Sequence, residues 1–305
     1  MPTIIKNLTV TFPTLAGPVY AVRDISFTIP DSKTVAIVGE SGCGKSVTAH
    51  SIVGLNPSCE TRGSILFNDA DLLKLDEKAM RSVRGRDIAM VFQNPMTSLN
   101  PTMRIGKQIA EGIRRHRSAN RKQALTQAAE MLKLVGIDPA RINHYPHQFS
   151  GGMRQRVMIA IALACHPQLL IADEPTTALD VDTQEQILTL IKKLQKQLKM
   201  SMIFITHNLK LIEGLCDEVI VMYAGKIVET GTVDKIFSSP IHPYTQALLG
   251  AIPKSGKPLQ TIAGQPPDMH TSLAGCPFCP RCPHAMKICQ REEPPSFCWL
   301  EVNNE

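Results

Sequence analysis

The sequence predicts an α/β fold in which a mostly parallel sheet is covered by helices on both faces. Short apolar runs typical of buried strands alternate with helical stretches over residues 34–206. Such alternation is typical of strand–helix–strand units, whose strands run parallel. A glycine-rich segment directly after the first of these runs is the second observation. Because ligands bind beyond the carboxyl ends of such strands, functional residues are expected at the ends of the apolar runs.

The bulk composition is typical of a globular protein that can bury a sizeable core. The 305 residues are 43% hydrophobic and 20% charged. The longest apolar run, 157–165, is too short to span a bilayer, and the N-terminus lacks a signal-peptide pattern. We therefore expect the chain to stay in the cytoplasm without inserting into a membrane. The net charge of +6 suits a phosphate ligand or an anionic membrane surface, and ordinary scatter in surface charge explains it equally well.

The N-terminal segment predicts two half-buried antiparallel strands. Apolar and polar side chains alternate over residues 4–10 and 22–29. The composition of the intervening residues 12–18 predicts a loop. Phe12 or Tyr20 offers a flat face that suits a purine base, although either is equally suited to a core position. Of the two, Phe12 is favoured as the base-stacking residue.

Residues 39–46, Gly-Glu-Ser-Gly-Cys-Gly-Lys-Ser, predict a phosphate-binding loop. They match the pattern G-x-x-x-x-G-K-[ST], with an apolar strand over 34–38 before them and a helix over 47–54 after them. Glycines let the backbone curl so that N–H groups point at an anion, and the helix N-terminus adds partial positive charge. The lysine then reaches the β- and γ-phosphates, and the final serine hydroxyl can bind Mg²⁺. The residues assigned to nucleotide binding here are Gly39, Ser41, Gly42, Cys43, Gly44, Lys45 and Ser46.

The remaining strands and helices follow from apolar runs and helix-spaced apolar positions. Two of the strands flank an Ala-Gly pair and predict a hairpin near residue 224. The predicted strands are 63–67, 87–93, 169–174, 202–207, 219–223 and 226–229, and the predicted helices are 104–115, 121–134, 153–164 and 184–198.

Polar residues end three of the predicted parallel strands and are expected to converge on one ligand. Asp173 is placed to hold Mg²⁺, directly or through water, and Glu174 to polarise an attacking water. Gln93 can reach the metal or the water, and His207 can contact the γ-phosphate. Taken alone, Gln93 or His207 is more commonly a structural residue. The catalytic candidates are therefore Glu174, His207 and Gln93, and the Mg²⁺ candidates are Ser46, Gln93 and Asp173.

A second anion site is predicted where the helical region is interrupted. Residues 144–152 break that region, and the helix over 153–164 follows directly. Gly151 and Gly152 leave backbone N–H groups exposed at the start of this helix.

With these residues in place, the chain resembles the nucleotide-binding subunit of an ABC transporter. Six motifs occur in the order typical of that family, and the resemblance covers the whole chain. Two residues depart from the family signature, where Phe149 and Met153 replace the usual Leu and Gln, while Ser150, Gly151 and Gly152 are retained. The six motifs are the phosphate loop 39–46, the Q-loop at Gln93, the signature 149–153, the Asp173–Glu174 strand end, the D-loop 178–180 and the switch His207.

The resemblance implies a P-loop NTPase with a RecA-like core, an antiparallel β subdomain and a helical subdomain at about 94–160. It implies hydrolysis of ATP with Mg²⁺, with Phe12 stacking on adenine. It also implies that two subunits pair head to tail, so that Ser150, Gly151 and Gly152 of one subunit contact the γ-phosphate bound by Lys45 of the other.

The C-terminal segment has a different composition and predicts a small appended module. Prolines are frequent beyond residue 238, which places the boundary near 235, between an ATP-binding domain at 1–235 and an extension at 236–305. Residues 239–249 and 275–289 resemble the extension of the dipeptide, oligopeptide and nickel importer subfamily, and residues 94–101 also resemble that subfamily.

Nine cysteines are present, and five of them lie in this extension. In a reducing compartment such a cluster indicates a metal site rather than a disulfide framework. The resemblance implies a [4Fe–4S] cluster on Cys276, Cys282, Cys289 and Cys298, with Cys279 as an additional cysteine. Tetrahedral Zn²⁺ or metal-free thiols remain alternatives.

The function expected from the resemblance is the ATP-hydrolysing subunit of an importer of dipeptides or oligopeptides at the cytoplasmic face of the membrane. Its partners would be a second ATPase subunit (a paralogue or a copy), two transmembrane permease subunits and, indirectly, an extracytoplasmic solute-binding protein, without nucleic acid. Import of nickel or another small solute is an alternative. A soluble ABC-type ATPase of nucleic-acid or ribosome processes is another, although the tandem cassettes or coiled-coil insertion usual there are not seen. A third hypothesis, compatible with the first, is that the extension gates the ATPase according to redox or metal status.

Overall fold

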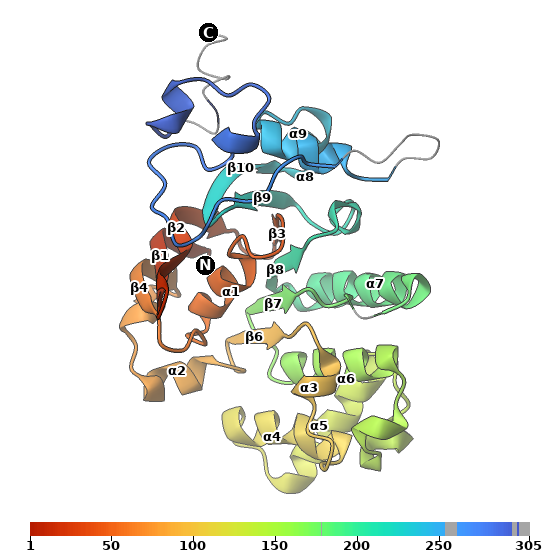
Figure 1. The fold of residues 1–305 in the computed structure, drawn as a ribbon. Coiled ribbons are helices and arrows are strands. Elements are labelled where there is room, and N and C mark those ends of the chain that lie inside the picture. Colours follow the sequence, from red (N-terminus) through yellow and green to blue (C-terminus); the bar gives the residue numbers. More distant parts are fainter. Residues whose placement is uncertain (178, 254–260, 295–297, 299–305) are drawn as a thin grey trace. The chain divides into compact units, whose positions relative to one another are not determined.

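The computed structural model describes residues 1–177, 179–253, 261–294 and 298 (Figure 1). The chain divides into two compact units, each described here by itself. The β-rich unit comprises Met1–Pro30, Thr34–Lys74 and Ile205–Glu305, and the helical unit comprises Asp31–Lys33 and Leu75–Phe204.

The first sheet of the β-rich unit is antiparallel, with the strand order β2-β1-β4-β5. The prediction of a loop over 12–18 is wrong, because Phe12 pairs with Val19 and Thr14 pairs with Gly17, so the two strands form one long hairpin. Gly17, with φ +115°, makes the tight turn possible. The strands are β1 Thr3–Thr14, β2 Gly17–Ile29, β4 Glu60–Phe67 and β5 Ala70–Asp71.

The second group of strands in the β-rich unit carries the phosphate loop. β3 Thr34–Val38 is buried along its whole length and runs parallel to β9 Glu218–Tyr223, as its continuous apolar sequence predicts. β10 Lys226–Thr232 pairs antiparallel with β9, which confirms the predicted hairpin at residues 224 and 225. The loop after β3 leads into helix α1, Lys45–Ile52.

The helical unit contains parallel strands whose carboxyl ends bear predicted site residues. β6 Ile88–Val91 pairs in parallel with β7 Leu169–Asp173, and β8 Ser201–Thr206 follows β7 in the strand order. The last two residues of β8 belong to the β-rich unit. Helix α7, Val181–Leu198, connects β7 to β8 along the chain and begins three residues earlier than predicted.

Three further helices of this unit, α4, α5 and α6, confirm the helices predicted at 104–115, 121–134 and 153–164, whereas α2 and α3 were not predicted (Figure 1). The capping box between Asn120 and Gln123 defines the start of α5 at the predicted residue. None of the described helices is long and apolar enough to cross a membrane. The helices are α2 Glu77–Val83, α3 Pro95–Ser98, α4 Ile105–His116, α5 Arg121–Leu134 and α6 Gly151–Leu163.

The C-terminal segment packs within the β-rich unit. Helix α8, Val233–Ser238, contacts β9 and β10, and α9, Pro243–Gly250, follows it. Pro243 begins α9, because a proline is tolerated in the first turn of a helix. Short 3₁₀ turns occur at Leu72–Lys74, Pro139–Asn143, Pro146–Gln148, Leu209–Leu211, Cys279–Arg281 and Ile288–Gln290.

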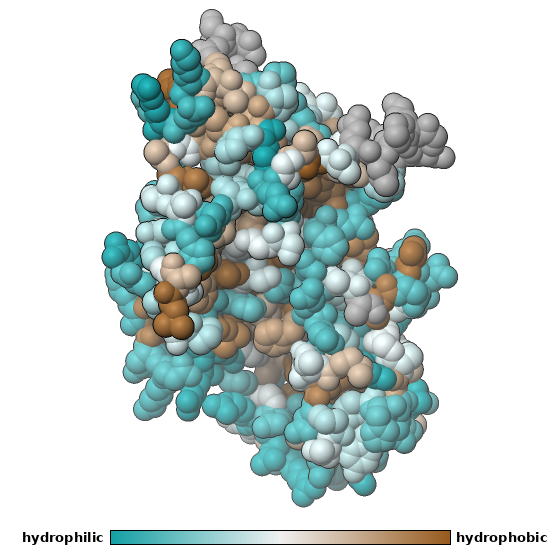
Figure 2. Space-filling model, in the orientation of Figure 1, coloured by the Kyte–Doolittle hydropathy of each residue, from teal (hydrophilic) through white to brown (hydrophobic). Residues whose placement is uncertain are grey.

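Aromatic side chains join this segment to β9. Tyr244 of α9 lies 4.6 Å from Tyr223, between ring centroids, and Phe278 lies 5.3 Å from both. All three side chains are almost fully buried. Burial of three aromatic rings is a large hydrophobic contribution, so the extension is packed as part of this unit's core. On the face seen in Figure 2, by contrast, hydrophilic residues dominate and hydrophobic residues are scattered among them.

Candidate active site

The phosphate loop after β3 has the curled backbone that its glycines predict. Gly39 has φ +152° and Gly44 has φ +100°. A Cβ on Gly39 would overlap the carbonyl oxygen of Met222, and one on Gly44 would overlap that of Ala21. Both positions therefore need glycine for two reasons, because the backbone conformation and the close approach of neighbouring strands each exclude a side chain.

Lys45 is the first residue of α1, and its side chain is enclosed by the loop. Its Nζ donates hydrogen bonds to the carbonyl oxygens of Gly39 at 2.9 Å and Glu40 at 2.8 Å. The residue is only 5% exposed. An ammonium group held at the mouth of a curled backbone is suited to binding an anion that replaces or shares these carbonyl contacts.

Cys43 lies inside the same loop, and its thiol is not reactive there. Burial raises the pKa of the Cys43 thiol, although the nearby Lys45 partly opposes the increase. The thiol therefore stays protonated at neutral pH and contributes packing. Ser41 and Gly42 are exposed at the tip of the loop, and Ser46 is half-buried in the first turn of α1, which contains no acidic residue. This turn keeps the partial positive charge of a helix N-terminus.

The end of β7 in the helical unit separates the two candidate carboxylates. Asp173 is the last strand residue and is 6% exposed. Glu174 has φ +45°, which is uncommon for a residue other than glycine. Its Oε2 accepts hydrogen bonds from Nε2 of Gln93 at 2.9 Å and from Oγ1 of Thr177 at 2.8 Å. The structure thus brings Gln93 and Glu174 together, as their places at the ends of neighbouring strands predict.

The signature segment forms the start of α6. Ser150 is the N-cap, and its Oγ accepts a hydrogen bond from the backbone N–H of Met153 at 3.3 Å. Ser150 and Gly151 are exposed, and Gly152 is half-buried beside Thr183. The first turn of α6 contains no acidic residue, so its exposed N–H groups and the serine hydroxyl can contact an anion.

Both departures from the family signature contact Arg141. The Arg141 guanidinium lies over the Phe149 ring at 4.9 Å and donates to the Met153 sulfur at 3.3 Å. Phe149 is 2% exposed. The two unusual residues therefore pack against Arg141, while Ser150 and Gly151 remain exposed.

For the remaining predicted ATP-site residues, the structure gives a position in the fold and an exposure to solvent. His207 is exposed directly after β8, and Phe12 is half-buried on β1. Both belong to the β-rich unit with the phosphate loop, whereas Gln93, Asp173, Glu174 and the signature belong to the helical unit. In the D-loop, Ala178 lies outside the described residues, and Asp180 caps α7.

The cysteines of the extension gather around one cavity. The side chains that line it include those of His242 and His284. Cys279 also lines it, so the structure places this additional cysteine with the four that the sequence assigned. The thiols are Cys276, Cys279, Cys282, Cys289 and Cys298.

The chemistry of these thiols suits a cation, but their arrangement is not that of a formed metal site. Burial, and then the neighbouring Cys289, Cys298 and Cys282, raise the pKa of Cys276 to about 11. Bringing several thiolates together would need a bound cation to offset their mutual repulsion. No group of three or more His, Cys, Asp or Glu side chains within the described residues is arranged to hold a metal ion.

His242 defines one side of the thiol cavity. Its Nδ1 accepts a hydrogen bond from the backbone N–H of Tyr244 at 3.0 Å, and its Nε2 lies 3.7 Å from Sγ of Cys276. Burial lowers the pKa of His242 to about 4, so the ring is neutral and carries its proton on Nε2. The imidazole is therefore a donor toward the Cys276 sulfur.

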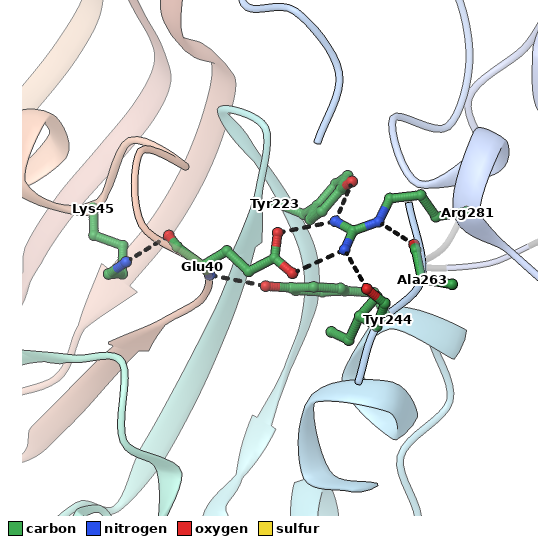
Figure 3. Close-up of polar contacts among 7 residues, drawn as sticks. Glu40, Lys45, Tyr223, Tyr244, Ala263 and Arg281 are labelled. Carbon is green, nitrogen blue, oxygen red and sulfur yellow. Dashed lines mark hydrogen bonds and ion pairs between the residues drawn. The ribbon is translucent and has the colours of Figure 1, made fainter. Parts of the chain in front are cut away.

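Glu40 and Arg281 are residues of the loop region that sequence reasoning missed. The Arg281 guanidinium forms an ion pair with the Glu40 carboxylate (Figure 3). The only local signal was an arginine inside the Cys-Pro-Arg-Cys segment 279–282, and it does not reveal a partner that is so distant in sequence.

Comparisons with known proteins agree with this arrangement. Residues 22–177 match the family model described as ABC transporter, and residues 228–289 match the model described as oligopeptide/dipeptide transporter, C-terminal region. The chain is 50% identical to the dipeptide transport ATP-binding protein DppD of Bacillus subtilis, over 97% of this chain and 94% of that protein. It is 47% identical to the oligopeptide transport ATP-binding protein OppD of Escherichia coli, over 95% of this chain and 88% of that protein.

Solved structures with the same fold include two of the ATP-binding cassette MJ0796. One is described as a dimeric post-hydrolysis state bound to ADP and Pi, and the other as a dimeric bacterial ABC transporter cassette. Each is 29% identical, with a TM-score of 0.68, and covers 76% of this chain and 98% of that chain.

Proposed function

This chain belongs to the ABC transporter family and is an ATPase of the cassette type, and we propose that it powers the import of dipeptides or oligopeptides. The similarity to DppD and OppD over nearly the whole chain supports a peptide cargo. The match of residues 228–289 to an oligopeptide/dipeptide transporter region supports the same cargo from a second part of the chain. No observation favours nickel import or a role with nucleic acid over this proposal.

The observation that carries the assignment of ATP binding is the curled loop that encloses Lys45. We assign the loop amides and Lys45 to the phosphates of ATP, with Gly39, Ser41, Gly42, Cys43, Gly44 and Ser46 completing the cradle. We place Phe12 against the adenine. In such a site catalysis comes from positioning and charge neutralisation rather than from covalent chemistry.

Gln93, Asp173 and Glu174 of the helical unit, with Ser46 and His207 of the β-rich unit, would supply the groups that act on water, metal and the γ-phosphate. We propose that Ser46, Gln93 and Asp173 hold Mg²⁺, whose charge neutralises the phosphates. Glu174 would accept a proton from the attacking water while the hydrogen bonds from Gln93 and Thr177 orient its carboxylate. His207, which follows the last strand of that series, would contact the γ-phosphate.

We also propose a head-to-tail dimer in which Ser150, Gly151 and Gly152 contact the γ-phosphate bound by a second cassette. The exposed start of α6 supports this, as do the dimeric states described for the solved cassettes. The second cassette would be a copy of this chain or a paralogue. Closing on ATP and opening after hydrolysis would then drive two transmembrane permease subunits, with an extracytoplasmic protein delivering the peptide.

The organisation of the chain follows from this proposal. Residues 1–235 would form the ATP-binding domain, with a helical subdomain at about 94–160 that docks on the permease. Residues 236–305 would form the importer-type extension. The protein would act at the cytoplasmic face of the membrane as a peripheral subunit.

The extension would hold a [4Fe–4S] cluster, with Zn²⁺ as the alternative occupant. Cys276, Cys282, Cys289 and Cys298 would be the ligands, and their place around one cavity supports this assignment. His242 would donate its Nε2 proton to Cys276 and orient that ligand.

Replacement of Lys45 by alanine tests the ATP site. Lys45→Ala should lose measurable ATP binding and hydrolysis, because it removes the ammonium group that the phosphate loop encloses. Binding is measured with a fluorescent ATP analogue, and hydrolysis by phosphate release. The matched control is Lys74→Ala, a side chain 82% exposed in the same unit, which should behave as wild type. Unchanged nucleotide affinity in Lys45→Ala would remove the basis of the proposal.

A further inference from the structure

A charged contact links the C-terminal extension to the phosphate loop, between residues 241 positions apart (Figure 3). The Nη1 of Arg281 donates to Oε2 of Glu40 at 2.9 Å, and its Nη2 donates to Oε1 at 3.3 Å. This is a two-pronged arrangement, which fixes direction as well as distance. The side chain of Arg281 is 5% exposed and that of Glu40 is 25% exposed, so the pair is poorly screened by water.

The Arg281 guanidinium is held by further contacts that leave it little freedom. It donates to the hydroxyl of Tyr223 at 3.0 Å and to the carbonyl oxygens of Ile262 at 3.1 Å and Ala263 at 2.9 Å. Burial lowers the pKa of Arg281, but its hydrogen bonds with Glu40 and Tyr223 outweigh this and raise it overall. The guanidinium is therefore a fixed positive charge beside the loop.

The backbone that carries Arg281 is equally well anchored. Arg281 ends the 3₁₀ turn Cys279–Arg281, and its N–H donates to the carbonyl oxygen of Phe278 at 2.9 Å. Phe278 is 1% exposed and packs against Tyr223 and Tyr244. The guanidinium thus projects from the packed core of the β-rich unit and not from a solvated loop.

Glu40 is the residue through which this anchor reaches the loop. Its backbone carbonyl accepts the hydrogen bond from Lys45, and its backbone N–H donates to the Tyr244 hydroxyl at 2.9 Å. Its carboxylate faces away from Lys45 and toward Arg281 (Figure 3). One residue therefore has its side chain held by the extension while its carbonyl contacts the phosphate-binding lysine.

We propose that Arg281 is a positioning residue for ATP binding, acting through Glu40 to hold the phosphate loop and to neutralise the carboxylate beside it. The proposal rests on the assignment of this loop to the ATP phosphates. Without Arg281, an unpaired carboxylate would remain next to a site that receives a highly negative triphosphate. Like charges at that separation oppose binding, and a loosened loop must be ordered again at each binding event.

The two effects predict a specific pattern in variants of the full chain. Arg281→Gln should raise the Kd for MgATP about fivefold or more, the usual size of coupling between sites. The double variant Glu40→Gln with Arg281→Gln should bind more tightly than Arg281→Gln alone, because it removes the repelling carboxylate. Glu40→Asp should weaken binding in the same direction as Arg281→Gln, because the shortened carboxylate keeps its charge but no longer reaches the guanidinium.

The experiment measures Kd with a fluorescent ATP analogue, the KM and kcat of ATP hydrolysis, and thermal unfolding without nucleotide. We expect KM to rise while kcat stays close to wild type, because Glu174 and its partners are unchanged. Arg62→Gln is the matched control, since Arg62 forms an exposed pair with Glu60 in the same unit. It should leave Kd and KM unchanged.

Three results would overturn the proposal. The first is wild-type affinity in a folded Arg281→Gln protein, and the second is a double variant no better than Arg281→Gln. If Arg281→Gln does not fold, Glu40→Asp decides, because it leaves the contacts of Arg281 with Tyr223, Ile262 and Ala263 in place. The third result is wild-type affinity for MgATP in the Glu40→Asp variant. Failure of the ATP-site assignment would give a different result. In that case the wild-type protein would not bind ATP, or Lys45→Ala would still bind it.

Discussion

At the scale of single residues, Glu174 has the most unusual conformation of the proposed catalytic residues. A glutamate with φ +45° directly after a buried strand is held there by its surroundings. Its carboxylate oxygen accepts two hydrogen bonds, from Gln93 and Thr177. The left-handed backbone at Glu174 breaks the extended geometry of β7, whereas Asp173 is still the last residue of that strand. The two adjacent carboxylates can therefore serve different roles.

Replacement of Glu174 by glutamine should separate binding from turnover. Glu174→Gln keeps the shape of the side chain but removes the proton acceptor, so ATP should still bind while hydrolysis falls by a factor of about 10² to 10⁴. A subunit that binds ATP without hydrolysing it should accumulate as a closed dimer. Phosphate release measures turnover, and size-exclusion chromatography with MgATP measures dimerisation.

Glu185→Gln is the control for this variant, because Glu185 is an exposed carboxylate of the same unit. It should hydrolyse ATP at the wild-type rate. Turnover retained by Glu174→Gln would show that another group accepts the proton.

At the scale of single elements, helix α7 begins at a side-chain cap that responds to pH. The Asp180 carboxylate accepts hydrogen bonds from the backbone N–H of Thr183 at 2.9 Å and from its hydroxyl at 2.8 Å. These two bonds lower the pKa of Asp180 from its ordinary value of 3.8. Because the folded-state pKa is the lower one, the stabilisation is complete above the ordinary value and is lost as pH falls through the folded-state value.

Asp180→Asn should remove this dependence while keeping the cap, since asparagine caps helices about as well as aspartate. The urea midpoint of the variant should match wild type at neutral pH and should fall less between about pH 5 and pH 2. Parallel profiles for wild type and Asp180→Asn would contradict the role of this carboxylate.

Other elements show where local sequence is a poor guide. The segment around Pro13 and Pro18 is typical of a loop, yet these prolines lie opposite each other at the end of a hairpin. Proline is excluded from central strands but tolerated near a hairpin end. Likewise, Pro243 begins α9 rather than interrupting it.

At the scale of the whole molecule, the extension is part of the unit that contains the phosphate loop. Its aromatic residues pack on β9, its arginine contacts Glu40, and its cysteines line one cavity. An occupant of that cavity would stabilise the folded chain, because thiol ligands are assembled only in the folded state.

If the cavity holds the [4Fe–4S] cluster proposed above, anaerobic purification should yield a brown protein that contains iron, and removal of the metal with a chelator should lower its unfolding temperature. Cys289→Ser should lose the iron, whereas Cys59→Ser, outside the extension, should keep it. Elemental analysis and the visible absorption spectrum measure both. A colourless, iron-free anaerobic preparation would exclude the cluster, and stoichiometric zinc would identify the alternative occupant.

The sequence by itself determined the class of fold, the phosphate loop, the strand ends and the family. These features depend on side-chain periodicity and glycine spacing within short stretches of sequence, so they can be recognised without knowing which distant residues they contact. Even the start of α5 follows from its own capping residues.

Only the tertiary structure decided which distant residues meet. The contact of Arg281 with Glu40, the inclusion of Cys279 among the cavity thiols, and the packing of Phe149 and Met153 on Arg141 all depend on how separate elements pack. Such contacts are set by strand register and by burial of apolar surface across the unit, and no local pattern encodes them.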